Sequence, residues 1–405
     1  MDPLETALRD ARAHTLSLVS DLTGARLLGP RLDIVNPPLW EVGHVGWFQE
    51  FWTLRTARGR PPLVQGSDEL YDSAKVAHDT RWDLPLLGRA QVFEYLDAVL
   101  ERSIAALRSP PDEDAYYHQL ALFHEDMHDE AFAYTRQTLA YPDPWPKPEP
   151  PARGAFPGDV EVPGARYRLG ALRGSGFVFD NEKWAHEVEV ARFRIARAPV
   201  TNAEFAAFVE GGGYRDERLW SDSGWRWRAG SGAQRPVYWE GQGHRRYDSL
   251  RPLPPDHPVI HVNWYEAEAF CNWAGRRLPT EAEWELAAST PAKHRFPWGD
   301  SGTFANLDSS AGGTVPVAAH PEGDSAYGCR QMIGNVWEWT STDFAPYPGF
   351  EIDPYKEYSQ PWFGTHKVLR GGCWATRARL LRNTYRNFYT PDRRDVFAGF
   401  RTCAR

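Results

Sequence analysis

The sequence contains few cysteines, no surplus of basic residues and no long apolar run, and each absence excludes a class of protein. Its 405 residues include only four scattered cysteines without a C-x-x-C pair, which excludes a disulfide framework. The net charge of −8 argues against nucleic acid or an anionic membrane as a partner. No apolar run approaches the ~18 residues that cross a bilayer.

The N-terminal stretch, residues 1–24, carries acidic and basic side chains throughout and has no continuous apolar segment. A signal peptide needs such a segment, so the stretch does not have the pattern of one. We therefore expect a cytoplasmic protein, a monomer or a small homo-oligomer, that binds neither a membrane nor nucleic acid.

Aromatic residues and prolines are plentiful. Aromatics make up 14% of the chain, with 18 tryptophans, which suits a loop-rich fold held by ring packing or a pocket lined by ring faces. Prolines concentrate between Tyr141 and Gly158, where they forbid a helix and favour an extended connector. The length allows two domains, and we expect a first domain over 1–143, a linker over 144–157 and a second domain over 158–405.

The first half is patterned for helices. In residues 91–108 the apolar side chains recur at helical spacing and form one stripe. Similar stripes run through residues 2–22, 38–55 and 113–139. Four such amphipathic helices predict an antiparallel four-helix bundle.

The second half is patterned for short strands and loops, and we predict an α+β domain there. Short β-prone segments are separated by clusters of Gly, Pro, Asp and Asn. These segments cover residues 166–171, 176–180, 186–196, 367–372 and 397–403. Two short helices are expected after the capping boxes Thr201/Glu204 and Thr280/Glu283, with Gly211 and Gly275 where helices stop.

The sharpest local motif is HEDMHDE, inside the last helix of the first half. His124 and His128 are four residues apart, so both rings leave the same helical face and can meet one ion. The most plausible third ligand is His44, on another helix whose apolar face must turn to the bundle core. Three neutral imidazoles on one side of a metal leave the opposite positions open for oxygen or substrate.

Other interpretations of these histidines remain open at this stage. An H-x-x-x-H pair alone is often two half-buried or surface histidines. His14, His78 and His118 could compete for the third position. Glu125 completes the H-E-x-x-H pattern of metalloproteases, although no third ligand of that class is evident downstream. Glu130 lies about 200° round the helix from His128, which suits a supporting or surface carboxylate.

Longer strings in the chain resemble known families. GNVWEW (334–339), RGG-x-W (370–374) and GFR (399–401) resemble the formylglycine-generating-enzyme fold, a C-type-lectin-like domain. A helical bundle with an H…H-x-x-x-H set before such a domain resembles the DinB-type bundle of the sulfoxide synthases of ergothioneine biosynthesis. The resemblance implies a mononuclear non-haem Fe(2+) held by His44, His124 and His128, with hercynine and dioxygen as substrates.

The resemblance also implies roles for residues of the second half. Asn387 and Phe388, in the string RNFY, stand where the family holds hercynine, whose quaternary ammonium suits ring faces. Tyr347 lies on the loop that brings a proton-donating tyrosine towards the iron, and Tyr355 and Tyr358 are weaker candidates. Taken alone, each of these aromatics is as well explained by packing.

The chain departs from the γ-glutamylcysteine-using enzymes where they bind that substrate. Those enzymes carry a pair of arginines in the stretch that matches AHDTRWDLPL. Here Arg81 is retained and His78 occupies the position of the other arginine, so the bidentate carboxylate fork is lost. Tyr389 replaces an acidic residue, and Met127 replaces a glutamine before the last ligand. The remaining pocket suits a neutral, hydroxyl-rich donor.

Three strings, LWEVGHVGWFQEFW, HDTRWDLPL and residues 372–403, resemble a sister group, the selenoneine synthases, which join hercynine to a selenosugar. We therefore expect a selenosugar as the chalcogen donor. The alternatives are an ergothioneine-type synthase that uses a thiol (γ-glutamylcysteine or cysteine) and, from another class, a non-catalytic lectin-like binding module.

Overall fold

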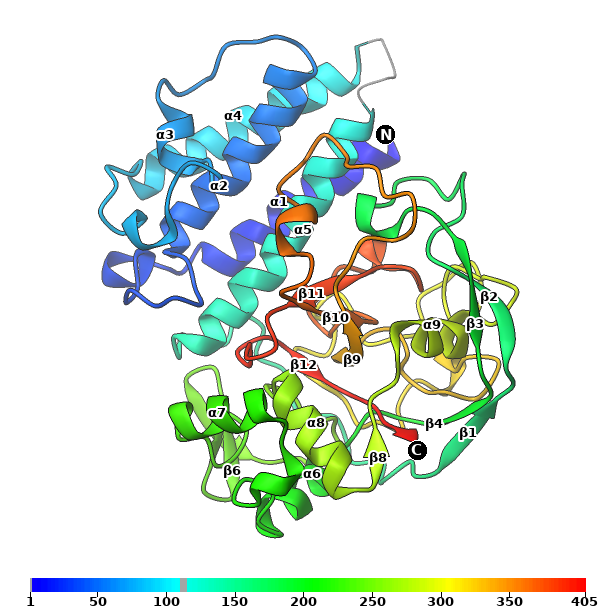
Figure 1. Ribbon diagram of the computed structural model, residues 1–405. Coiled ribbons are helices and arrows are strands. Elements are labelled where there is room, and N and C mark those ends of the chain that lie inside the picture. Colours follow the sequence, from blue (N-terminus) through cyan, green and yellow to red (C-terminus); the bar gives the residue numbers. More distant parts are fainter. Residues whose placement is uncertain (1, 110–114) are drawn as a thin grey trace. The chain divides into compact units, whose positions relative to one another are not determined.

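A computed structural model describes residues 2–109 and 115–405, which form two compact units, Met1–Pro144 and Trp145–Arg405. The first unit is helical (Figure 1). Its four long helices are α1 (Pro3–Val19), α2 (Pro38–Glu50), α4 (Arg89–Leu107) and α5 (Ala115–Thr138). The shorter elements of this unit are η1 (Gly24–Leu27), η2 (Phe51–Thr56), α3 (Ser67–Tyr71) and η3 (His78–Thr80).

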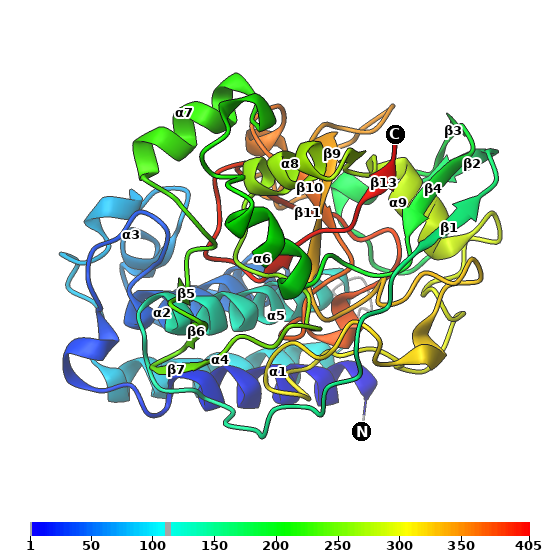
Figure 2. The same ribbon diagram turned by 90° about the horizontal axis from the view of Figure 1, so that it is seen from below.

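The long helices pack as a bundle, as the apolar stripes predict. Figure 2 shows α2 and α5 side by side in one layer, with α1 and α4 in the other, and α1 also packs on α5 and α2 on α4. Nearly every residue of α2 is buried, so this helix is central to the unit. On α4, the predicted stripe residues Leu96, Val99 and Ile104 are buried. Of the residues expected to start the last helix, Glu113 lies outside the described residues.

Helix α2 and the turn η2 that follows it together cover the predicted stripe of residues 38–55. The helix begins at Pro38, at the position where the missing N–H of proline costs nothing, and runs on as a π-helical turn, η2. The short helix α3 is fixed against this region because Asp68 accepts from the Trp47 indole and pairs with Arg55. These bonds hold the N-terminal end of α3 beside α2 and η2.

The second unit contains short strands in four sheets and four α-helices among the described residues. One sheet has the order β1 (Asp159–Val162), β4 (Phe193–Ala196), β13 (Cys403–Ala404) and β8 (Arg276–Arg277). Another has the order β11 (Asn387–Tyr389), β10 (Lys367–Arg370), β9 (Trp337–Asp343) and β12 (Ala398–Gly399). The third pairs β2 (Ala165–Leu169) with β3 (His186–Val190), and the fourth joins β5 (Trp239–Glu240), β6 (Gly243–Arg246) and β7 (Ser249–Pro252).

The second unit contains more α-helices than the two predicted from capping boxes. The expected α6 (Asn202–Glu210) and α9 (Glu281–Ser289) begin after Thr201 and Thr280, as predicted. The expectation of two helices was wrong, because α7 (Asp222–Ser231) and α8 (Trp264–Trp273) are also present. Helix α8 has its own capping box, Asn263 with Glu266, and Gly275 follows this helix rather than α9.

One further expectation differs from the structure. Residues 176–180 form no strand and lead instead into the single turn η5 (Asp180–Glu182). The proline-rich segment, residues 141–158, contains no helix or strand, and the guanidinium groups of Arg197 and Arg330 each lie 4.1 Å from the ring of its Phe156. The remaining single turns are η6 (Glu217–Leu219), η7 (Pro321–Gly323), η8 (Gln360–Trp362) and η9 (Ala378–Leu380).

Much of the aromatic content lies in the cores. Trp40 in the first unit and Trp284, Trp337 and Trp339 in the second are almost completely buried. The indole N–H groups of Trp40, Trp284 and Trp339 donate to the Leu70 carbonyl, the Glu338 carboxylate and the Val262 carbonyl, as buried indoles require. Among the described residues, no helix combines the length and apolar character needed to span a membrane.

Candidate metal centre

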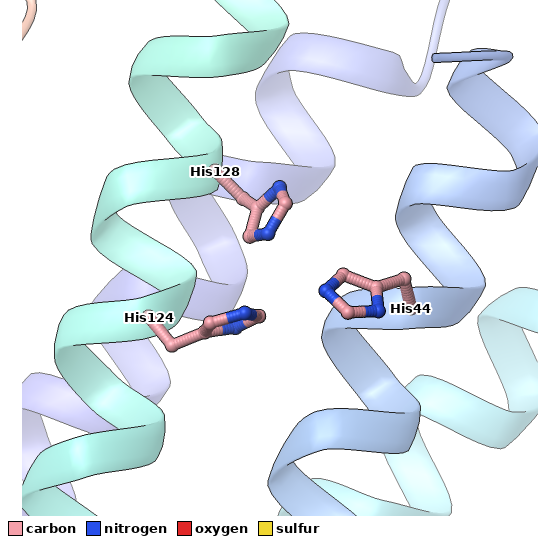
Figure 3. Close-up of side chains that lie close together, drawn as sticks. All are labelled: His44, His124 and His128. Atoms are coloured by element: carbon pink, nitrogen blue, oxygen red, sulfur yellow. The ribbon is translucent and has the colours of Figure 1, made fainter. Parts of the chain in front are cut away.

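Three histidine side chains meet between α2 and α5. Figure 3 shows His44, from α2, facing His124 and His128, from α5. One ring nitrogen from each lies within 4.8 Å of the others, close to the span of about 4 Å that two ~2.1 Å metal–nitrogen bonds bridge. This histidine triad is the only such group of His, Cys, Asp or Glu in residues 2–109 and 115–405.

The competing histidines are placed elsewhere. His78 shares a hydrogen bond with the Val35 carbonyl and His118 with the Ser103 carbonyl, and His14 lies on α1 outside the triad. Glu125, the residue that completes a protease-like motif, pairs with Arg12 and accepts from Thr15. These bonds hold the Glu125 carboxylate inside the bundle, which argues against the metalloprotease interpretation.

Burial keeps the His44 and His124 imidazoles unprotonated, which leaves them able to bind a metal ion. His44 and His124 are each 3% exposed, whereas the His128 side chain is 18% exposed. Burial, followed by the proximity of the other imidazoles, holds the pKa of His44 and of His124 well below its ordinary value. Both rings are neutral at pH 7, so each offers a lone pair to a cation.

Each ring of the triad is oriented by a different kind of contact. His44 Nδ1 lies 2.8 Å from the Tyr71 carbonyl, and His128 Nδ1 lies 2.6 Å from a carboxylate oxygen of Glu41. The His124 ring stacks on Phe48 at a centroid distance of 3.5 Å and an angle of 4°. These contacts fix the rings before any ion binds, which is typical of residues around a metal site.

The Tyr71 carbonyl reaches His44 because of where α3 ends and because Gly43 has no side chain. Tyr71 is the last residue of α3, so its carbonyl lacks a partner within that helix. A Cβ on Gly43 would lie 2.2 Å from the Tyr71 ring, which therefore packs directly on the α2 backbone. The close approach brings the Tyr71 carbonyl within reach of the neighbouring His44.

The two helices that carry the triad also concentrate negative charge. Six of their carboxylates are buried: Glu41, Glu50, Glu125, Asp126, Asp129 and Glu130. Three arginines of this unit are buried, Arg12, Arg81 and Arg136, and Arg136 pairs with Asp21 outside these two helices. Buried carboxylates in excess of buried cations favour a bound divalent cation, so the residues present fit a metal ion.

Three of the residues expected at the chalcogen-donor site, Arg81, His78 and Met127, belong to the first unit. Arg81, 8% exposed, donates to Asn36 and to the Val76 carbonyl, and its guanidinium lies 3.8 Å from the Trp40 ring centroid. Burial lowers its pKa to about 10. Trp40 in turn stacks on the His44 ring. Met127 is half-buried on α5, one residue before His128.

The two residues expected to bind hercynine, Asn387 and Phe388, lie on an edge strand of the second unit together with Tyr389, which was expected at the donor site. Asn387, Phe388 and Tyr389 form β11, which pairs with β10. Phe388 stacks on Phe344 at 4.0 Å, and Asn387 accepts from the backbone N–H of Phe388. The guanidinium of Arg393 lies 5.6 Å from the Tyr389 ring.

Tyr347 is buried within the second unit. Its hydroxyl donates to Glu281 at 3.0 Å, and the guanidinium of Arg386 lies 4.2 Å from its ring. Burial raises the pKa of Tyr347 well above its usual value, so the phenol remains protonated. Its role as a proton donor stays a prediction. The other candidates, Tyr355 and Tyr358, are half-buried and lie near each other.

Comparison with known proteins supports this assignment of the two units. The DinB superfamily model matches residues 7–132, and the model described as Sulfatase-modifying factor enzyme 1-like domain matches residues 145–405. The Hercynine oxygenase of Mycolicibacterium thermoresistibile is 42% identical over 98% of this chain and 94% of that protein. The chain belongs to the hercynine oxygenase family. The family's Mycolicibacterium smegmatis member is 38% identical over 99% of this chain and 98% of its own length.

Membership of this family confirms two expectations. The chain is an enzyme of an oxygenase family, and its fold is a DinB-type helical bundle followed by a C-type-lectin-like, formylglycine-generating-enzyme-like domain. The Formylglycine-generating enzyme of Streptomyces coelicolor is 36% identical over 64% of this chain and 92% of that protein, which fits the second domain. The family's enzymatic character argues against a non-catalytic binding module.

Sequence reasoning missed the residues that orient the triad. Glu41 lies one turn before His44 on the same helix, so an acidic residue at that spacing was a usable signal. The Phe48 stack could also have been suspected, since Phe48 lies one turn after His44. The Tyr71 carbonyl could not have been found, because a main-chain atom leaves no trace in the residue pattern.

Proposed function

We propose that this chain is an iron(II)- and dioxygen-dependent oxygenase that attaches a chalcogen to the imidazole of hercynine. The observation that carries the proposal is the histidine triad in a chain that aligns over nearly its whole length with hercynine oxygenases. His44, His124 and His128 would hold the iron. Iron(II) accepts imidazole ligands readily, and three of them leave positions free for dioxygen and substrate.

Bound iron would supply the activation of dioxygen. In the overall reaction, the imidazole C–H and the donor S–H or Se–H each give up a hydrogen. A carbon–chalcogen bond forms, one oxygen atom of dioxygen is retained as the sulfoxide or selenoxide, and the other leaves as water with both hydrogens. The triad's part is to present three neutral nitrogen atoms, held in place by Tyr71, Phe48 and Glu41.

For the substrate side, we assign the binding of hercynine to Asn387 and Phe388. Phe388 belongs to an aromatic cluster with Phe344 and Tyr358, whose ring faces suit a trimethylammonium group that cannot donate a conventional hydrogen bond. Tyr347 is the assigned proton donor, supported by its protonated state at neutral pH. Tyr389 completes the edge strand that would face the substrate.

For the chalcogen donor, we propose a selenosugar. Arg81 and His78 stand where a carboxylate clamp would be needed, and both already bond to groups of the first unit. A donor with two carboxylates would leave them unpaired, at a cost of about 1–3 kcal/mol each. At roughly 1.4 kcal/mol per tenfold change, this disfavours γ-glutamylcysteine by about a hundredfold or more.

The competing proposal is a thiol donor, γ-glutamylcysteine or cysteine, as in ergothioneine biosynthesis. The identity of about 40% to proteins named hercynine oxygenase favours it, because the chain aligns with them over 98% or more of its length. Both donors require the same iron site and the same hercynine site, so the choice rests on residues such as Arg81, His78 and Met127.

A competition experiment separates the two donors. The full-length protein is reconstituted with iron(II) without oxygen, mixed with hercynine and equal amounts of selenosugar, thiosugar, cysteine and γ-glutamylcysteine, and then exposed to air. Mass spectrometry should show the selenosugar product in about hundredfold excess over the γ-glutamylcysteine product. Preferential coupling of γ-glutamylcysteine would reject the selenosugar and restore the thiol donor. No hercynine-dependent oxygen uptake with any donor would reject the oxygenase proposal itself.

A further inference from the structure

Glu41 is the carboxylate that contacts the triad. It lies on α2 with 1% of its side chain exposed, and one of its oxygens is 2.6 Å from His128 Nδ1. Among the described residues, its second carboxylate oxygen is buried and has no hydrogen-bond partner. Glu41 is three residues before His44 on α2. Helix α2 therefore carries His44 and, through Glu41, also contacts His128 of α5.

We propose that Glu41 is a positioning residue that fixes the tautomer and the ring orientation of His128 and strengthens its bond to the metal; this proposal rests on the proposed iron site. A histidine that donates Nδ1–H to a carboxylate must present its Nε2 lone pair on the opposite side of the ring. A carboxylate partner also raises the electron density on the ring, so Nε2 becomes a better ligand. His44 Nδ1 hydrogen-bonds to the neutral Tyr71 carbonyl, whereas His128 Nδ1 contacts a carboxylate, so the two rings differ in the charge of their partners.

The carboxylate that supports the triad comes from α2 and not from α5. Glu130, two residues after His128, was the acidic residue that the sequence indicated, and it is buried on α5. Glu41 instead reaches His128 from the facing helix. The Glu41–His128 bond therefore joins α2 to α5 at the triad, and it holds the two ligand-bearing helices in register before an ion binds.

The first test measures metal affinity in the full-length protein. Glu41→Ala, Glu41→Gln and the control Glu50→Gln are purified without metal and titrated anaerobically with Fe(II) and Co(II) against a competing chelator. Glu50 is a matched control because it is equally buried on the same helix but accepts from Tyr95 and from the Leu63 N–H. Glu41→Ala should bind both ions about 10–100-fold more weakly than the unmodified protein, and Glu50→Gln should bind them within threefold of it.

The second test does not depend on metal. In metal-free, ¹⁵N-histidine-labelled protein, a long-range ¹H–¹⁵N correlation spectrum should show His128 protonated on Nδ1. Glu41→Ala should give a mixture of tautomers at His128 and leave His44 unchanged. Glu41→Gln should keep the tautomer, because the amide oxygen still accepts from Nδ1–H, yet lose about tenfold in affinity because the charge is gone.

The outcomes separate this proposal from the proposed function. In folded Glu41→Ala protein, either an unchanged metal affinity or an unchanged tautomer of His128 overturns the positioning role. If Glu41→Ala does not fold, Glu41→Gln decides through its affinity, and equality with the unmodified protein overturns the proposal. If the unmodified protein binds neither ion, the iron site fails while the tautomer spectrum still decides the role of Glu41.

Discussion

Replacing Gly43 by alanine should destabilise the first unit and weaken the metal site together. The new Cβ would lie 2.2, 2.5 and 2.7 Å from three ring atoms of Tyr71, distances that real Cβ contacts do not reach. Tyr71 is completely buried, so its ring has no open space to enter. Overpacking of this kind costs about 1–3 kcal/mol.

A second cost arises at His44. If Tyr71 moves, its carbonyl leaves His44 Nδ1, and a buried donor without a partner costs about 1–3 kcal/mol. Alanine regains up to about 1 kcal/mol of helix propensity over glycine. The net loss of stability should therefore be about 1–5 kcal/mol. Because the lost contact orients a ligand, metal affinity should also fall by about tenfold or more.

Urea denaturation of the metal-free protein measures the stability term, and chelator competition with Co(II) measures the affinity. Gly230→Ala is the control, because a Cβ at this helical glycine meets nothing within 4 Å and should be neutral or slightly stabilising. A Gly43→Ala protein as stable as the control, with unaltered Co(II) affinity, would refute the account of how Tyr71 and His44 are held together.

Three further predictions test other parts of the account. Alanine at any histidine of the triad should remove bound iron and abolish turnover, whereas His14→Ala should do neither; full activity of the His128→Ala protein would rule out the triad. Arg12→Ala should cost about 3–5 kcal/mol in urea denaturation, because it leaves the Glu125 carboxylate buried without its cation; a loss below 1 kcal/mol would contradict this. Tyr347→Phe should retain iron but lower turnover by the ~10²–10⁴-fold typical of a lost general acid. An unchanged rate and product ratio would move that role to another tyrosine or to water.

Helical periodicity let the sequence predict much of the first unit. The apolar stripes of α4 and α5 specify which faces are buried, because side chains three and four residues apart share a helix face. The same rule placed His124 and His128 together. It could not by itself choose His44 over His14, His78 or His118, since all four lie in the same half of the chain.

The second unit was less predictable because its strands are short and its order is non-local. In the sheet with the order β1-β4-β13-β8, strands far apart in the sequence are neighbours, whereas β2 with β3 and β5 with β6 and β7 pair locally. No local period encodes that pairing. The capping box of α8, Asn263 with Glu266, was present in the sequence and was overlooked.

The residue order alone supplies the three histidines proposed as ligands, the helical spacing of His124 and His128, and the family strings of the second half. The contacts that orient the triad depend on how the helices pack. The Glu41 contact crosses from α2 to α5, and the Tyr71 carbonyl is a main-chain group delivered by the end of α3. Neither is a property of a residue pattern, because both depend on how closely two helices approach. Gly43 sets that approach for Tyr71, and its importance is visible only once the ring that packs on it is in place.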